Sequence, residues 1–217
     1  NKILRESYQN LGITLVELLT IDTYDFNSAS AKVQYSNIEL ITQAKERGNG
    51  VIVLSGHFGN WELLAYSAGK LLSETIRLVI KYQMNPYTDR YLRNLRQRSG
   101  NQLIDMDKAG MSLVKALKRN DIIALLTDQR AGRNEGLLLD FLARPARVYK
   151  APALLALKFN TPVLVGFAVR DNDNNYKVDL VEIDHADLED NAEGVEELTK
   201  RYLELLEKAI EKNPGHW

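Results

Sequence analysis

Apolar and polar residues are arranged in segments that predict strands and helices in alternation. Short continuous apolar runs, typical of strands buried on both faces, occupy residues 51–54, 76–80 and 122–126. Apolar residues at helical spacing occupy the stretches between these runs. The alternation predicts an α/β fold with a mostly parallel central sheet covered by helices on both faces.

The remaining elements follow from the same patterns. An amphipathic helix is expected over residues 1–20, because apolar residues recur there at the spacing of one helical face, a stripe that usually packs into the core: Leu4, Tyr8, Leu11, Leu15 and Leu18. A polar stretch follows at about 22–35. Helices are also expected at 38–44, 61–68, 87–98, 111–118, 152–159 and 195–209, and strands at 102–104, 137–142, 163–169 and 176–183.

A histidine and a carboxylate stand five residues apart where the strand at 51–54 gives way to a helix. The segment reads SGHFGNWE over residues 55–62. Active sites of open parallel sheets lie outside the carboxyl ends of strands, and a histidine there takes a proton from a hydroxyl if a second group fixes its tautomer. Glu62 is the nearest candidate for orienting His57. The alternative is structural, with Asn60 as the helix N-cap and Glu62 interacting with the helix dipole.

This segment resembles the first motif, His-x4-Asp/Glu, of the glycerolipid acyltransferase superfamily, in the form carried by the lipid A biosynthesis (lauroyl/myristoyl) acyltransferases. The similarity continues through RESYQNLG at 5–12, NPY at 85–87, RQRSG at 96–100, TDQ at 127–129, FLARPA at 141–146, PALLA at 152–156 and TPV at 161–163. It therefore covers almost the whole chain. Ala143 and Ala151 stand where the family more often has glycine, and Arg130 where it has an acidic or small residue.

The resemblance implies a single acyltransferase domain over residues 1–217, with a membrane anchor and a C-terminal tail expected beyond its ends. It implies transfer of a fatty acyl chain from a thioester of acyl carrier protein or coenzyme A to a hydroxyl of a membrane glycolipid, with a lipid A precursor as the leading candidate. His57 and Glu62 would be catalytic, and no cofactor is required. The implied location is the cytoplasmic face of the bacterial inner membrane, on the membrane surface.

Basic residues are concentrated between Lys81 and Arg98, a segment that contains five basic residues and one acid, Asp89. Guanidinium forks bind phosphate oxygens bidentately. Arg98 and Arg96 lie in a block that matches the family, and we expect them to bind the phosphate of a lipid head group or of a phosphopantetheine arm. A solvated helix face is the alternative. A second basic cluster, able to face anionic lipid or an acidic carrier or to form a plain surface loop, comprises Arg144, Arg147 and Lys150.

Asp128, Gln129, Asn60 and Arg170 complete the predicted substrate-binding set. Asp128 follows a buried strand, where it is placed to orient a sugar hydroxyl or to hold an arginine such as Arg98 or Arg170. A structural ion pair or a helix-cap contact is the alternative for Asp128, and Gln129 has the same two interpretations.

Composition narrows the possibilities further. The chain of 217 residues is 45% hydrophobic and 26% charged, which fits one globular domain. It has no cysteine, and His57, His185 and His216 show no ligand-type spacing, so we expect no metal site. A net charge of -1 argues against a nucleic-acid partner. No apolar run approaches the roughly 18–20 residues of a membrane span.

Two rival functions stay open at this level. Ser55 would be the nucleophile of a serine hydrolase or thioesterase, although the Gly-x-Ser-x-Gly pattern is absent and Ser55 stands only two residues from its own base. A non-enzymatic module that binds anionic lipid is the other. For acyl transfer, the expected oxyanion donors are backbone N–H groups at the glycine turn or at the helix N-terminus, with a nearby arginine. Acyl chain length, donor carrier, acceptor hydroxyl and oligomeric state are not fixed by the sequence.

Overall fold

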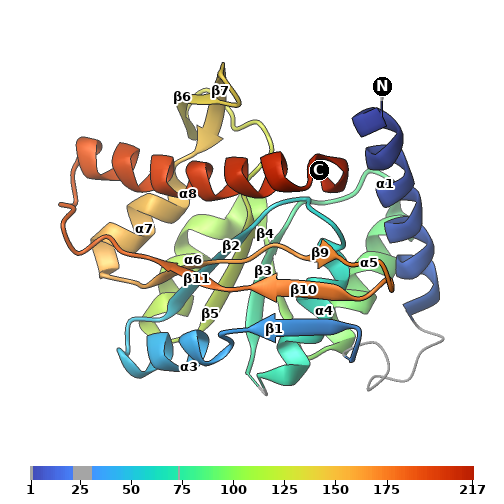
Figure 1. Cartoon of the computed structure of the whole chain (residues 1–217). Helices are drawn as coiled ribbons and strands as arrows, with labels where there is room; N and C mark the ends of the chain where they lie inside the picture. Colours follow the sequence, from blue (N-terminus) through green and yellow to red (C-terminus); the bar gives the residue numbers. More distant parts are fainter. Residues whose placement is uncertain (1, 22–30, 73) are drawn as a thin grey trace.

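The computed structural model describes residues 2–21, 31–72 and 74–217, and it is built around a sheet whose strands run through the centre of the molecule (Figure 1). In the described chain this sheet has six strands in the order β11-β8-β2-β5-β3-β4. The strands are β2 (Val51–Ser55), β3 (Ile76–Ile80), β4 (Gln102–Asp105), β5 (Ile122–Leu126), β8 (Val163–Val165) and β11 (Val181–Ile183). The α/β class predicted from the sequence is therefore confirmed.

The pairing of the strands is mixed. β2 pairs in parallel with β5 and β8, and β3 pairs in parallel with β4 and β5, but β11 runs antiparallel to β8. Two smaller sheets also contain antiparallel pairs: β1-β10-β9, formed by β1 (Val33–Ser36), β10 (Tyr176–Asp179) and β9 (Val169–Arg170), and the hairpin of β6 (Gly136–Phe141) and β7 (Arg144–Tyr149). The prediction of a mostly parallel sheet is not confirmed.

Two expected strands are each divided in the structure, which produces the additional sheet. The strand expected at 163–169 becomes β8 and β9, because the backbone at Ala168 passes so close to the motif turn that a Cβ on Gly59 would lie 1.7 Å from the Ala168 carbonyl oxygen. The strand expected at 176–183 becomes β10 and β11, and between them Leu180 N–H donates to the Ser36 carbonyl. Regular pairing in one sheet is thus interrupted where the chain supports the motif turn.

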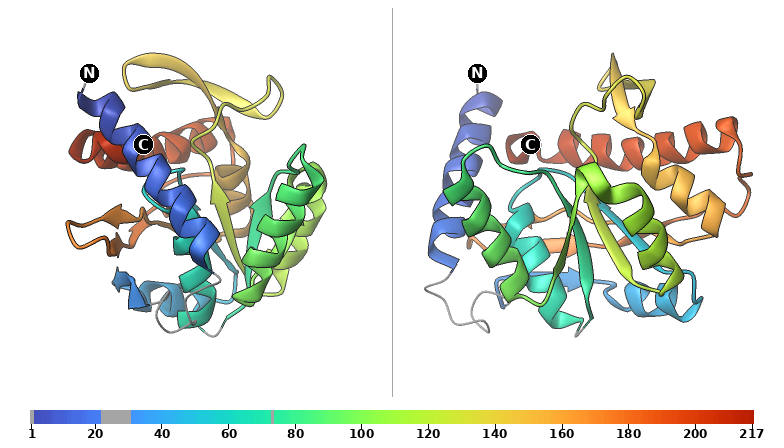
Figure 2. Two further views of the ribbon diagram at one scale, coloured as in Figure 1. Left: turned by 90° about the vertical axis from the view of Figure 1, so that its right-hand side faces the viewer. Right: turned by 180° about the vertical axis from the view of Figure 1, so that it is seen from behind.

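Helices cover both faces of the central sheet (Figures 1 and 2). One face is covered by α3 (Glu39–Glu46), α4 (Trp61–Leu71), α5 (Pro86–Arg98) and the β1-β10-β9 sheet, and the other by α6 (Ala109–Lys118), α7 (Ala151–Phe159) and α8 (Ala192–Lys212). Neighbouring strand residues point to opposite faces. Val51 accordingly packs with Leu63 of α4, whereas Ile52 belongs to the cluster that contains Leu206 of α8.

The N-terminal helix, α1 (Lys2–Thr20), forms as expected, but its polar face, not its apolar face, is directed toward the rest of the protein. Tyr8 is 69% exposed and Leu15 is 50% exposed, whereas Asn10 and Thr14 are buried. Both buried side chains donate to the Gly59 carbonyl oxygen, Asn10 at 3.3 Å and Thr14 at 2.9 Å. Because the docking surface offers a backbone carbonyl that needs donors, α1 packs through its polar face. The expectation that the apolar stripe faces the core is wrong for Leu4, Tyr8, Leu11 and Leu15, which are exposed, and holds for Leu18, which packs against the core.

Neither α1 nor any other helix in the described parts of the chain is sufficiently long and apolar to cross a membrane. The predicted location at the cytoplasmic face of the inner membrane, through an N-terminal anchoring helix, is contradicted by this finding.

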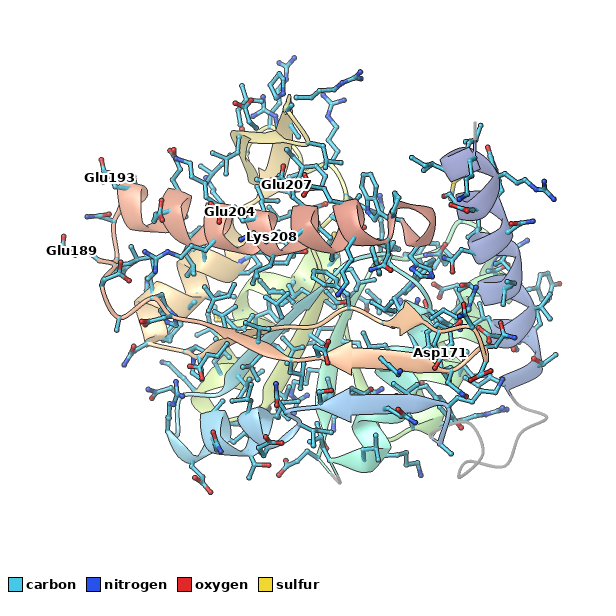
Figure 3. All side chains as sticks on the ribbon, viewed as in Figure 1. Asp171, Glu189, Glu193, Glu204, Glu207 and Lys208 are labelled. Carbon is cyan, nitrogen blue, oxygen red and sulfur yellow. The ribbon has the colours of Figure 1, made fainter. Side chains whose placement is uncertain are left out.

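Two strands were not expected. Residues 22–30 of the predicted polar stretch lie outside the described residues, but its end forms β1. The strand expected at 137–142 is β6, and the unexpected β7 returns beside it after a tight turn at Leu142 (φ 50°) and Ala143 (φ 57°). Glu207, on the side of α8 next to this hairpin, accepts the Leu142 N–H (Figure 3). The left-handed backbone at Ala143 is a conformation that glycine adopts without strain.

Candidate active site

The glycine turn that follows β2 holds His57 at the carboxyl edge of the central sheet. Gly59 adopts a φ of 60° and lies against Ala168, so a residue with a side chain does not fit there. Asn60 then caps α4, because its Oδ1 accepts the N–H of Leu63 at 2.9 Å. Backbone and cap together fix where the strand ends and the helix begins, and with them the position of His57.

The imidazole of His57 is oriented by Asp128. His57 Nδ1 lies 2.8 Å from Asp128 Oδ1, and the His57 backbone N–H donates to Oδ2 at 2.8 Å. Asp128 follows β5, the parallel neighbour of β2, so both residues leave the same edge of the sheet. A carboxylate at Nδ1 keeps the proton on that nitrogen and leaves Nε2 as the acceptor. The side chain of His57 is 32% exposed, whereas that of Asp128 is 4% exposed.

Asp128 receives a further hydrogen bond from the indole of Trp217, whose Nε1 lies 3.1 Å from Oδ2. Burial alone would raise the pKa of Asp128, but the bonds from His57 and Trp217 outweigh it and hold this pKa below its ordinary value. The phenol of Tyr202 is also close, and burial raises its pKa, so it stays neutral. The carboxylate is therefore ionised and fully engaged over the neutral pH range.

Glu62 does not hold the imidazole in this structure, and the prediction of that role requires correction. Its carboxylate forms a bidentate pair with Arg96 of α5, with Nη2–Oε1 at 2.6 Å and Nε–Oε2 at 3.0 Å. The two side chains are only 8% and 16% exposed. The first turn of α4 directs Glu62 toward α5, and it is the Trp61 ring that meets the imidazole, edge-on at 4.9 Å. The spacing in the motif therefore pointed to the wrong carboxylate for this role.

The other predicted residues fall into two groups. Gln129 is exposed beside the imidazole of His57, with its Nε2 3.4 Å from His57 Nε2. Arg98 lies exposed in the last turn of α5. Asn60 and Arg170 form hydrogen bonds within the protein. Asn60 Nδ2 donates to Glu17 at 2.8 Å, and Arg170 donates through Nε to the Tyr176 hydroxyl at 2.7 Å.

The hydroxyl expected to act as a nucleophile and the backbone N–H groups expected to bind an oxyanion already form hydrogen bonds within the protein. Ser55 Oγ donates to the Gly166 carbonyl at 2.7 Å rather than to His57. The N–H groups of His57, Phe58 and Gly59, expected to receive an oxyanion, donate to Asp128, to Gly56 and to His216. Within the described residues, no group of three or more His, Asp or Glu side chains is placed to hold a metal ion.

An apolar cavity of about 110 Å³ lies between the central sheet and α4. Ser55, Trp61, Glu62 and Arg96 line its end near His57. Its opposite end is lined by Ile76 and Ile122, which lie at the amino ends of their strands, and by Tyr35. The Tyr35 hydroxyl is hydrogen-bonded to Ser67 Oγ at 2.7 Å. Since both Ile76 and Ile80 contribute, the cavity follows β3 for about 13 Å, four residue rises of roughly 3.3 Å. We name it the α4 cavity.

Fold and site together define an α/β protein that carries a histidine–aspartate pair at a sheet edge beside an apolar cavity, a combination suited to activating a hydroxyl next to an apolar substrate. The family model described as bacterial lipid A biosynthesis acyltransferase matches residues 1–217. The chain belongs to this family, and it is therefore an acyltransferase of lipid A biosynthesis that uses an acyl donor and a lipid acceptor. No curated protein matches it.

Proposed function

We propose that this protein transfers a fatty acyl chain, of the lauroyl or myristoyl class, from an acyl thioester to a hydroxyl group of a lipid A precursor. The observation that carries the proposal is the imidazole of His57, held by Asp128 through Nδ1 and packed against Trp61, which lines the α4 cavity. Membership of the lipid A acyltransferase family supports the reaction type. Acyl carrier protein or coenzyme A supplies the thioester.

In the proposed mechanism, His57 Nε2 takes the proton of the acceptor hydroxyl as its oxygen attacks the thioester carbonyl. Asp128 keeps the other proton on Nδ1 and stabilises the imidazolium. When the tetrahedral intermediate collapses, the C–S bond breaks, the new C–O ester bond remains, and the imidazolium returns its proton to the leaving thiolate. No acyl group is attached to the protein at any step.

Gln129 is the donor best placed for the oxyanion. Its amide nitrogen lies 3.4 Å from His57 Nε2 and carries a second N–H for the oxyanion, whereas the backbone N–H groups of His57, Phe58 and Gly59 are already engaged. A preorganised donor of this kind typically contributes a few kcal/mol to the transition state. The Glu62–Arg96 pair stands at the end of the α4 cavity near His57, and we propose that Glu62 acts by fixing the Arg96 guanidinium beside the thioester. Arg98, farther along α5, is proposed to bind a substrate phosphate.

The α4 cavity is proposed to hold the acyl chain of the donor. Its lining is mainly aliphatic, and it starts where the thioester carbonyl must lie to meet the acceptor hydroxyl. Burying a chain there removes apolar surface from water, worth about 0.8 kcal/mol for each methylene. Binding energy from the chain can thus position the reacting carbonyl.

The test is acyl transfer by the purified protein from lauroyl or myristoyl thioester to a detergent-dispersed lipid A precursor. Thiol release that depends on the acceptor, together with an acylated product in mass spectrometry, is expected. His57→Ala should lower the rate at least about a hundredfold with an unchanged circular dichroism spectrum. Ser55→Ala should retain most of the activity. Thiol release without acceptor would indicate a hydrolase instead, and no release would indicate a binding module.

A further inference from the structure

A second apolar cavity lies on the opposite face of the central sheet. It has a volume of about 350 Å³, within the range of roughly 300–1,000 Å³ usual for ligand pockets. Its walls come from α6 and α7, including Gly110, Leu113, Leu154 and Leu155. We name it the α6/α7 cavity. No step of the proposed mechanism so far uses it.

The two cavities share lining residues at the edge of the sheet that carries His57. Val79, Leu125 and Leu126, at the carboxyl ends of β3 and β5, line both of them. The α6/α7 cavity is also lined by Thr127, the residue before Asp128. A chain in either cavity would therefore lead toward the same place, next to the carboxylate that orients His57.

The rim of the α6/α7 cavity carries positive charge. Lys150 lines the cavity, and Arg147 lies on β7 three residues before it, with its guanidinium against the Arg133 carbonyl at 3.5 Å. One acid, Glu135, also lines the cavity, so Lys150 and Arg147 together leave an excess of one positive charge at the rim. An apolar cavity with cations at its edge matches a lipid that has acyl chains and an anionic head group.

We propose that the α6/α7 cavity binds an acyl chain of the acceptor lipid, while the α4 cavity binds that of the donor. This inference rests on the proposed acyl transfer, in which two chain-bearing substrates must meet at His57. The relative sizes favour this assignment, because the smaller cavity, of about 110 Å³, has room only for part of a single thioester chain, whereas the cavity of about 350 Å³ has room for a bulkier lipid. Two chains entering from opposite faces leave the reacting carbonyl and hydroxyl together at the edge.

Gly110→Phe is the test variant. Gly110 is an exposed residue of the cavity lining, and a Cβ there would meet no atom within 4 Å, so a ring can be added at the cavity mouth without displacing the backbone. Gly12→Phe is the matched control, because Gly12 on α1 has equally open surroundings and lines neither cavity. Ala68→Leu narrows the α4 cavity. Steady-state kinetics would use detergent-dispersed lipid A precursor and lauroyl thioester.

We expect Gly110→Phe to raise the KM for the acceptor about tenfold and to leave the KM for the donor within about twofold. Ala68→Leu should raise the KM for the donor and leave the KM for the acceptor nearly unchanged. Gly12→Phe should change neither KM. A Gly110→Phe protein with an unchanged acceptor KM, or with a raised donor KM instead, would overturn the assignment.

A second measurement separates this inference from the proposed reaction. A lipid A precursor with a diazirine in one acyl chain is photolysed on the His57→Ala protein, where no turnover is needed, and the labelled peptides are mapped. Labels on α6 and α7 that Gly110→Phe abolishes support the inference even if the protein transfers no acyl group. Labels confined to other elements refute it even if transfer is observed.

Discussion

Asp128 accepts three hydrogen bonds from two distant parts of the chain, and this arrangement determines what the site can do. Two come from His57, through its ring and its backbone, and one comes from Trp217. Each donor stabilises the ionised carboxylate, which in turn keeps the imidazole in one tautomer. By contrast, both carboxylate oxygens of Glu62 accept hydrogen bonds from Arg96. The two carboxylates of the site should therefore fail in different ways when they are altered.

Asp128→Asn should lower turnover at least about a hundredfold with little change in melting temperature, because the amide keeps the shape but favours the wrong tautomer. Glu62→Gln should also lower activity, but with a melting temperature reduced by about 5 °C or more, since Arg96 loses its countercharge in a largely buried position. Adding Arg96→Met should restore stability without activity. The test is to measure the melting temperature of each variant by calorimetry and its turnover in a parallel assay. A fully stable, inactive Glu62→Gln protein would place Glu62 among the groups that touch the substrate.

Trp217→Phe should shift the acidic limb of the pH–stability profile, measured by denaturant unfolding across the acidic range, to higher pH. The folded-state pKa of Asp128 is depressed, so its stabilising contribution is complete above the ordinary carboxyl pKa and is lost as the pH falls through the depressed value. Removing the indole donor raises that pKa and moves the loss upward. Phe141→Leu is the control, because it removes the ring that contacts Trp217 at 5.8 Å and keeps the N–H. Identical shifts in both variants would make Trp217 a packing residue only.

At the level of elements, prediction succeeded where local signals were sufficient. The bounds of β3 and β5 were predicted at both ends, because apolar runs between polar turns define buried strands. The helix expected at 87–98 begins one residue earlier, at Pro86, after the Asn85 cap. β7 was missed since its arginines and Pro145 conceal alternation. Asp128 was a candidate, but its contact with His57 depends on β2 and β5 being neighbours, which local spacing cannot show.

The β6–β7 turn should tolerate, and gain from, a glycine. Ala143 has a φ of 57°, a conformation that costs an L-residue roughly 1–2 kcal/mol and glycine almost nothing. Ala143→Gly is expected to raise the free energy of unfolding by about 1 kcal/mol, less the extra entropy of the unfolded chain. Ala146→Gly, within β7, is the control and should destabilise. Denaturant unfolding measures both, and a destabilised Ala143→Gly protein would contradict the turn geometry.

Over the whole molecule, α1 connects distant parts of the chain to the active site. It lies beside the C-terminal segment η3 (Pro214–His216) in both views (Figures 1 and 2), and Ser7 Oγ donates to the Trp217 carbonyl at 2.9 Å. Glu17 accepts from Asn60 and from the Tyr176 hydroxyl, which ties the helix to the motif cap and to β10. Periodicity revealed that α1 has two faces, but only the donors required at Gly59 decide which one is turned inward.

The orientation of α1 can be tested with two neighbouring residues that the sequence and the structure rank in opposite order. Thr14→Val keeps the size of the side chain but removes the bond to the Gly59 carbonyl, so it should lower the free energy of unfolding by about 1–2 kcal/mol and reduce turnover by loosening the catalytic turn. Leu15→Gln changes a half-exposed side chain and should alter stability by no more than about 0.5 kcal/mol. If the apolar stripe faced the core, Leu15→Gln would be the damaging change and Thr14→Val nearly silent. Denaturant unfolding of the two variants, with turnover measured in parallel, distinguishes the two orientations.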